Sequence, residues 1–127
     1  MLLDTCALLW LVTGSDRLSA TARALIGRHP DRLHVSAVSA LEVGIKHARG
    51  RLVLPMPPDE WFARAVEFHG LHEIPIDGRI AAQSTMLPAI HADPADRILV
   101  STALCEGLTL LTPDDHIRSY PGLRCEW

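Results

Sequence analysis

Five acidic residues stand at positions from which a folded chain could bring them together. Asp4 closes a short apolar run, and Asp114 follows another apolar run after a Thr-Pro turn. Glu42 lies six residues beyond a third apolar stretch. Asp93 and Asp96 flank a proline, and a separation of three residues places them on one face of a helix. Carboxylates that share a small volume repel one another unless a cation neutralises them. If the fold brings these acids together, the place where they meet would therefore bind a cation.

An oxygen-rich cluster without cysteine suits a hard cation. Mg²⁺ typically binds one or two carboxylates together with water and a substrate phosphate. One or two such ions can activate water and stabilise the charge that develops when a phosphodiester is cleaved. Each acid also has a structural interpretation, because aspartate often forms turns and caps helices, and Asp93 precedes a proline as helix openers do. Asp77 and Asp115 fit the turn or cap interpretation alone.

Short apolar runs alternate along the chain with longer segments of helical pattern. Ser19 and Asp77 are good N-caps, while Gly14 and Gly107 stand where helices end, and Gly50 is expected at a C-cap position. The predicted strands are 1–4, 33–36, 72–76, 108–111 and 123–127. The predicted helices run from Thr5 to the stop at Gly14, and then over 20–28, 38–49, 59–69, from the Asp77 cap to about 87, and 94–106, with a short helical turn over 113–120.

Strands that alternate with helices predict βαβ crossovers, and therefore an α/β fold with a mainly parallel sheet flanked by helices. A chain of 127 residues has the size of one domain, 1–127, and can bury a core without disulfides. In such sheets ligand sites lie outside the carboxyl ends of the strands, where the strand order reverses. Asp4 and Asp114 follow predicted strands and meet this expectation.

The composition narrows the class of protein. Hydrophobic residues make up 48% and charged residues 21% of the chain, which is typical of a globular protein and not of a disordered one. Three widely spaced cysteines argue against a disulfide framework or a zinc module. No apolar run reaches the roughly 18 residues of a membrane span, and Asp4 interrupts the pattern of a signal peptide, so we expect a cytoplasmic protein without a membrane partner. The net charge of −3 by itself argues against a nucleic-acid partner.

Four segments, spread in order over nearly the whole chain, together resemble the PIN-domain family. They are LLDTCALLW (2–10), VSAVSALEVGIKHARGRL (35–52), LPAIHADPADRILVSTAL (87–104) and LTLLTPDDHIRSY (108–120). More narrowly, they resemble the toxin nucleases of VapBC-type toxin–antitoxin pairs. The resemblance implies a five-strand, mainly parallel sheet and four acids that bind Mg²⁺ or Mn²⁺. It also implies a homodimer that cuts RNA and is silenced by a cognate antitoxin.

By position, the resemblance assigns the catalytic and metal-binding acids to Asp4, Glu42, Asp96 and Asp114. Asp93 belongs to an H-x-D-P-x-D-R form of the third segment, in which it would support the four acids or serve as an alternative ligand. Three departures from the residues usual in close relatives leave the four acids untouched: Cys6 in place of histidine, Ala95 in place of phenylalanine, and a first strand kept short by its start at Met1.

Two threonines and one histidine stand beside these acids. Thr5 could hydrogen-bond a metal-bound water or cap the helix at which it stands. Thr112 could orient Asp114 or simply end a strand. His91 could act as an acid–base group or have a structural role in front of its helix.

The basic residues also have two interpretations. Lys46, Arg49 and Arg51 lie in the densest basic stretch, which suits either a rim that holds phosphate or a solvated helix end whose dipole favours cations. Lys46 could also pair with Glu42, one helical turn earlier. Arg97 could bind phosphate or brace the acidic cluster.

These features predict a Mg²⁺-dependent endoribonuclease in which metal-activated water attacks phosphorus and leaves 5′-phosphate and 3′-hydroxyl ends. The alternative is a catalytically silent PIN-like module that binds RNA or protein, although carboxylates help a binder of polyanions only if a metal is present. A phosphatase-like hydrolase with Asp4 as nucleophile is a weaker rival, because Cys6 stands where a second aspartate would be expected.

The expected partners are an RNA substrate, a second copy of the chain, and a small antitoxin protein whose C-terminal segment would cover the acidic groove. The apolar block 8–12, which contains Trp10, would lie in the core or in a dimer interface. The net charge does not exclude RNA if the acids hold a cation, since one Mg²⁺ would change it from −3 to about −1. The basic residues would then be free to face the RNA.

Overall fold

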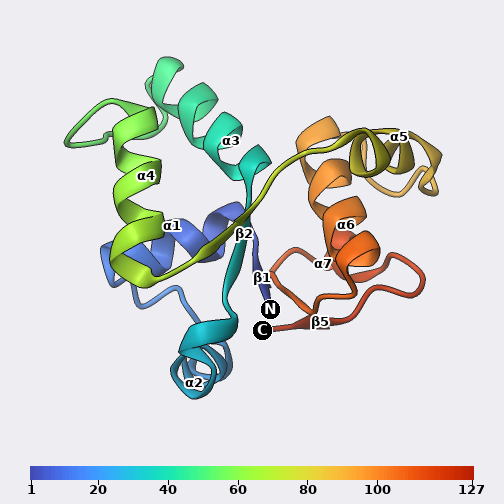
Figure 1. Cartoon of the computed structure of the whole chain (residues 1–127), viewed down its shortest axis with the longest axis horizontal. Coiled ribbons are helices and arrows are strands. Elements are labelled where there is room, and N and C mark those ends of the chain that lie inside the picture. Colours follow the sequence, from blue (N-terminus) through green and yellow to red (C-terminus); the bar gives the residue numbers. More distant parts are fainter.

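The computed structural model describes residues 1–127 and shows a central sheet with helices on both sides (Figure 1). Its five strands are β1 (Leu2–Leu3), β2 (His34–Ser36), β3 (His72–Ile74), β4 (Leu110–Leu111) and β5 (Cys125–Glu126). Its helices are α1 (Thr5–Thr13), α2 (Ala20–Arg28), α3 (Ala37–Ala48), α4 (Pro58–His69), α5 (Gly78–Met86), α6 (Pro94–Glu106) and α7 (Asp115–Arg118), with one 3₁₀ turn, η1 (Pro30–Arg32). No helix has the length and apolar character that crossing a membrane requires.

All neighbouring strands run parallel, in the order β3-β2-β1-β4-β5. Leu3 of β1 lies in register with Val35 of β2 and Leu111 of β4, so these three strands end side by side. The chain moves from β1 outward to β2 and β3, and then returns to the other side of β1 for β4 and β5. The strand order therefore reverses between β1 and β4, and the predicted α/β class with a five-stranded parallel sheet is confirmed.

The sheet is buried on both faces because successive residues of a strand point to opposite sides. Leu3 joins a core that includes Trp61 and Phe62 and lies against α1 to α4. Leu2 joins a second core with Leu99 of α6 and Ile117 of α7. Figure 1 shows this division, with α1 and α4 on one side and α5, α6 and α7 on the other.

The apolar block 8–12 belongs to the first core. Leu8 is completely buried, and Trp10 packs its ring at 5.6 Å from the ring of Trp127. Core packing is therefore confirmed for Leu8, and the other residues of the block pack against the core while remaining partly exposed.

The helix boundaries agree with the prediction to within about two residues, because caps are local signals. The side chains of Ser19 and Asp77 accept backbone N–H groups at the starts of α2 and α5. Gly14 follows α1 with a φ of 64°, a left-handed conformation that glycine adopts without strain. One detail is wrong: Arg49 is the C-cap of α3, and Gly50, with a φ of 69°, comes after it.

The strands are shorter than predicted, since a strand needs partners at a distance along the chain. Pro75 follows the end of β3, and proline has no N–H to donate to a neighbouring strand. Leu108 was expected to open a strand, but its N–H donates to the carbonyl of Ala103 and completes the C-terminus of α6. The strand predicted over 123–127 is reduced to β5. The helical turn predicted over 113–120 is reduced to α7, because Asp114 caps it.

Candidate active site

Asp4 ends β1 and begins α1. Its Oδ1 accepts the backbone N–H of Ala7 at 2.6 Å, as the N-cap of α1. The buried hydroxyl of Thr112, which follows β4, also donates a hydrogen bond to the Asp4 carboxylate. Asp4 is only 5% exposed, so two donors hold a nearly buried carboxylate at the carboxyl edge of the sheet.

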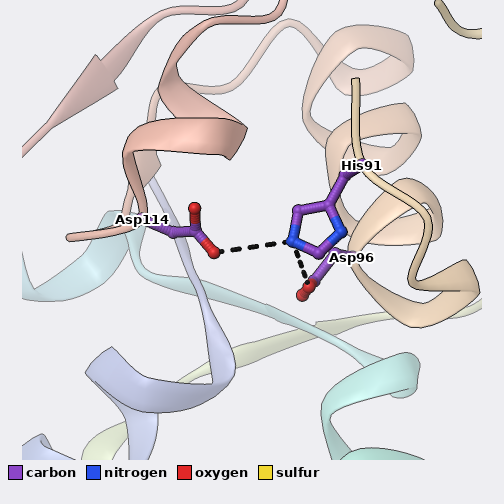
Figure 2. Close-up of side chains that lie close together, drawn as sticks. All are labelled: His91, Asp96 and Asp114. Atoms are coloured by element: carbon purple, nitrogen blue, oxygen red, sulfur yellow. Dashed lines mark ion pairs between the residues drawn. The ribbon is translucent and has the colours of Figure 1, made fainter. Parts of the chain in front are cut away.

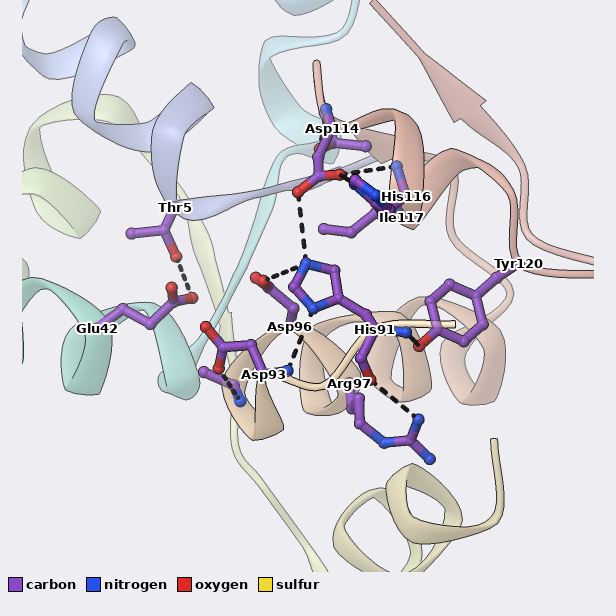
Figure 3. A network of polar contacts seen from close by, with 12 residues as sticks. Thr5, Glu42, His91, Asp93, Asp96, Arg97, Asp114, His116, Ile117 and Tyr120 are labelled. Carbon is purple, nitrogen blue, oxygen red and sulfur yellow. Dashed lines mark hydrogen bonds and ion pairs between the residues drawn. The ribbon is translucent and has the colours of Figure 1, made fainter. Parts of the chain in front are cut away.

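Asp114 arrives from the neighbouring strand β4. Its backbone N–H donates to Thr112 Oγ1 at 3.1 Å, so Thr112 contacts both Asp4 and Asp114. Oδ1 of Asp114 accepts the N–H of His116 at 2.8 Å and caps α7. Its Oδ2 points toward the ring of His91, as Figure 3 shows. Thr112 therefore does more than end a strand, because it links the two acids.

Glu42 reaches the same edge from α3. Its Oε1 accepts a hydrogen bond of 2.7 Å from the hydroxyl of Thr5, which also lies 3.0 Å from the hydroxyl of Ser39. The expectation that Thr5 caps a helix is wrong, because Asp4 is the cap and Thr5 is the first residue of α1. The expected ion pair between Lys46 and Glu42 is absent.

Asp93 and Asp96 come from the start of α6. Asp93 caps this helix by accepting the N–H of Ala95 at 2.9 Å, which agrees with its structural interpretation. Asp93 also lies in the acidic cluster, because Glu42, Asp93 and Asp96 each place one carboxylate oxygen within 4.8 Å of the others. The start of α6 and the second turn of α3 therefore present their acids to one small volume.

His91 lies between Asp96 and Asp114 (Figure 2). Its Nε2 is 3.1 Å from Oδ2 of Asp96 and 3.6 Å from Oδ2 of Asp114. The sequence left an acid–base role and a structural role open for His91 and did not predict its place between two carboxylates. The available signal was the H-x-D-P-x-D-R pattern, which fixes His91 five residues before Asp96.

Asp96 thus lies in one cluster with Glu42 and Asp93 and in another with His91 and Asp114. The charges of Glu42 and Asp114 also act on Asp4, which lies beside the point where the order of the parallel sheet reverses. A family model described as the PIN domain matches residues 1–123. The chain belongs to the PIN domain family. The family resemblance of the four sequence segments is therefore confirmed.

Other proteins resemble this PIN domain over nearly its full length. Ribonuclease VapC22 of Mycobacterium tuberculosis (strain ATCC 25618 / H37Rv) is 32% identical over 121 residues, which cover 94% of this chain and 91% of that protein. The DNA-bound VapBC structure from Salmonella typhimurium gives a TM-score of 0.71 at 18% identity, over 98% of this chain and 95% of that chain. A toxin–antitoxin complex from Klebsiella pneumoniae gives a TM-score of 0.65 at 22% identity, over 96% and 93% of the two chains. The two structural matches establish the fold alone.

Burial and crowding raise the pKa of three acids in this PIN domain. Burial raises the pKa of Asp4 to about 6, although its two hydrogen bonds act in the opposite direction. Burial, followed by the charges of Glu42 and Asp93, raises the pKa of Asp96 to about 6. Burial also raises the pKa of Glu42, against the hydrogen bond from Thr5. A cation among these carboxylates would relieve both the desolvation and the repulsion.

A groove of about 300 Å³ adjoins the acids along α3. Glu42 and Asp93 line it, and so do Lys46, Arg49 and Arg51 from the C-terminal end of α3 and the residues after it. Acidic and basic side chains of this PIN domain therefore share one groove.

Arg97 braces the segment that leads into α6. Its guanidinium donates hydrogen bonds of 2.9 to 3.3 Å to the backbone carbonyls of Ser84, Leu87, Pro88 and His91. Because these bonds occupy the guanidinium, the structure agrees with a bracing role for Arg97 and not with phosphate binding.

Proposed function

We propose that this PIN domain is a divalent-metal-dependent endoribonuclease and the toxin of a VapBC-type toxin–antitoxin pair. The observation that carries the proposal is the convergence of Asp4, Glu42, Asp96 and Asp114, from four separate elements, at the reversal point of the sheet. The 32% identity to ribonuclease VapC22 along almost the whole chain supports the same activity.

The four acids are the proposed metal ligands, with Asp93 as a supporting or alternative ligand. These carboxylates are buried or half-buried, and the pKa values of Asp4, Glu42 and Asp96 are raised. Such a set fits a hard divalent cation such as Mg²⁺, and Mn²⁺ accepts the same oxygen donors. Such an ion, when bound, would neutralise the developing charge at phosphorus and activate water as the nucleophile. The protein's own contribution is orientation: Thr5 holds Glu42, and Thr112 links Asp4 to Asp114.

The proposed substrate is RNA, held by its backbone in the groove along α3. Lys46, Arg49 and Arg51 would bind the phosphates next to the scissile one, because they line the groove that also contains Glu42. The protein as a whole carries a charge of −3, so binding of a polyanion depends on this local positive rim and on neutralisation of the acids by a cation.

The proposed partners are a small antitoxin protein and a second copy of the chain, in the cytoplasm. Structures that share this fold include VapBC assemblies from Salmonella typhimurium and Rickettsia felis, which supports an antitoxin partner. We place the antitoxin's C-terminal segment over the acidic groove, with a basic side chain facing the carboxylates. Leu41 and Ile45 of α3, 54% and 40% exposed, offer apolar surface for a protein contact.

Incubation of the purified protein with single-stranded and structured RNAs tests the activity. We expect cleavage in Mg²⁺ or Mn²⁺, 5′-phosphate and 3′-hydroxyl ends, and no cleavage in EDTA. Asp4→Asn should reduce the rate by more than the roughly 10- to 100-fold typical of residues that only support a metal site. Asp115→Asn, whose side chain is 95% exposed, is the matched control and should cut like the wild type. Metal and RNA binding without any cleavage would favour the catalytically silent module instead.

A further inference from the structure

His91 is fixed in place by three parts of the chain (Figure 3). Its backbone N–H donates to the hydroxyl of Tyr120 at 3.1 Å, and its carbonyl accepts from Arg97 at 3.3 Å. Its ring Nδ1 accepts the backbone N–H of Asp93 at 3.2 Å. Only 22% of the side chain is exposed. The imidazole therefore has a fixed position in the acidic site and is not a mobile surface group.

These contacts determine which ring nitrogen carries the hydrogen. A backbone N–H can only donate, so Nδ1 must offer its lone pair to Asp93. In a neutral imidazole the hydrogen then lies on Nε2, and Nε2 is the atom that faces Asp96 and Asp114. The Nε2 that lies beside the two carboxylates therefore carries a hydrogen and not a lone pair. A nitrogen that coordinates a cation would instead have to present a lone pair.

Asp96 and Asp114 share this nitrogen as a contact. No hydrogen bond reaches the Asp96 carboxylate, whose Oδ2 lies 3.1 Å from Nε2 of His91 in an ion-pair contact. Oδ1 of Asp114 is occupied at the N-terminus of α7 by the N–H of His116. The Oδ2 atoms of the two acids both face the same Nε2, at 3.1 and 3.6 Å. Because the acids come from different elements, His91 is the side chain that ties the start of α6 to the turn after β4.

We propose that His91 is a positioning residue that sets the separation of Asp96 and Asp114 through the contacts of its Nε2 with both carboxylates, without coordinating the metal itself. The inference rests on the proposed metal site. Groups that hydrogen-bond metal ligands orient them, and their loss weakens metal affinity even though they never touch the ion.

Mn²⁺ binding to the full-length protein tests the inference independently of RNA cleavage. Titration followed by calorimetry and by the electron paramagnetic resonance signal of free Mn²⁺ should show that His91→Ala weakens binding by roughly 10- to 100-fold. His91→Gln keeps a side-chain N–H and should recover most of the loss. His116→Ala is the matched control: this histidine lies 3.6 Å from Oδ1 of Asp114 and is 77% exposed, and its removal should leave the affinity within about twofold.

A second measurement separates positioning from coordination. In electron spin-echo spectra of wild-type protein loaded with Mn²⁺, we expect no coupling between the ion and a nitrogen of His91. A coupling to His91 would be recognised because the His91→Gln variant would lack it. Such a coupling would make His91 a ligand and overturn the inference. Equal Mn²⁺ affinities of His91→Ala and the wild type would also overturn it, and would leave the proposed metal site intact. Absence of Mn²⁺ binding by the wild type would overturn both.

A second variant tests the same inference if His91→Ala fails to fold, as thermal unfolding in EDTA would show. Tyr120→Phe removes the hydroxyl that receives the His91 N–H and leaves the ring in its buried position. We expect Tyr120→Phe to weaken Mn²⁺ binding in the same direction as His91→Ala, by a smaller factor. An unchanged affinity in a folded Tyr120→Phe protein, together with a nitrogen coupling that His91→Gln removes, would contradict the positioning role.

Discussion

Asp4 and Asp96 suit the proposed metal chemistry, but their carboxylates destabilise the folded protein when no cation is present. Each has a pKa raised from 3.8 to about 6, chiefly by burial. A carboxyl group whose pKa is higher in the folded than in the unfolded state binds protons more tightly in the folded state. Its contribution to stability is therefore present below about pH 4 and is lost as the pH rises through about 6.

Neutralising one of these acids should therefore stabilise the metal-free protein. In EDTA at pH 7.5, we expect Asp96→Asn to raise the melting temperature by a few degrees Celsius relative to the wild type, and we expect the difference to disappear near pH 4. Asp115→Asn, at an almost fully exposed position, is the control and should leave the melting temperature unchanged. A lower melting temperature for Asp96→Asn at pH 7.5 would contradict this assignment.

The affinity for a divalent metal should depend on the same two carboxyl groups, but it should increase with pH, whereas their contribution to stability decreases. Protons compete with a cation for Asp4 and Asp96, whose pKa values are about 6, so Mg²⁺ and Mn²⁺ should bind progressively more weakly as the pH falls from 7 to 5. Calorimetry in buffers of different ionisation enthalpy should detect protons released on binding near pH 6. An affinity that is constant between pH 5 and 7 would show that these carboxylates are not the ligands.

At the scale of elements, the segment between α5 and α6 is the part of the site that depends most on side-chain contacts for its position. It has no regular structure over residues 87–93, and Arg97 ties its carbonyls to α6. Because His91 lies in this segment, the acids depend on a brace that never touches them. Lysine cannot reproduce these bonds, since it lacks the planar fork of arginine donors.

Arg97→Lys should therefore loosen the segment without removing a charge. We expect a loss of about 1 to 3 kcal/mol in the free energy of unfolding, because several charge-assisted hydrogen bonds are lost. We also expect faster hydrogen exchange over residues 84–91. Arg64→Lys, in an exposed pair with Glu60, is the control and should change stability by no more than about 0.5 kcal/mol. Equal exchange rates in Arg97→Lys and the wild type would rule out the brace.

The elements differ in how far the sequence alone predicts them. Helices α2 and α6 match their predicted ranges, because caps such as Ser19 and Gly107 act within one turn. Strand ends depend on pairing with distant residues, so Leu108 was misassigned when the local pattern was the only guide. The same limit applies to α7, whose start is set by the Asp114 side chain.

The candidate site was predictable to a similar degree. The positions of Asp4 and Asp114 after strands follow from the α/β pattern. Glu42, Asp93 and Asp96 were candidates from their spacing, and only the family resemblance assigned Glu42 and Asp96 to the set of four acids. The place of His91 between two acids was not predictable, because it depends on how the segment before α6 packs beside the turn after β4. Local sequence carries no signal for that tertiary contact.

At the scale of the whole molecule, the distribution of charge matters more than its sum. The protein has 15 acidic and 12 basic residues, yet Lys46, Arg49 and Arg51 surround the groove beside the acids. A polyanion approaching that groove meets the basic rim first and the acids only at the edge of the sheet. If the acids hold a divalent cation, the local potential along the whole groove becomes attractive.

Removal of this rim should weaken RNA binding in a way that net charge does not explain. In an Asp4→Asn background, we expect combined substitution of Lys46, Arg49 and Arg51 by glutamine to weaken single-stranded RNA binding. The slope of log affinity against log salt should fall by about 2, since each lost phosphate contact contributes roughly 0.7. Fluorescence anisotropy at several salt concentrations measures both quantities.

The matched control removes three positive charges elsewhere. Arg17, Arg28 and Arg32 are exposed, lie in or beside α2, and make no side-chain hydrogen bonds or ion pairs. Their combined substitution by glutamine changes the net charge by the same amount and should leave the salt slope nearly unchanged. If both triple variants weakened binding equally, RNA would be responding to total charge, and the groove along α3 would not be its path. A loss confined to the first variant would place the RNA backbone beside the acids that are proposed to cut it.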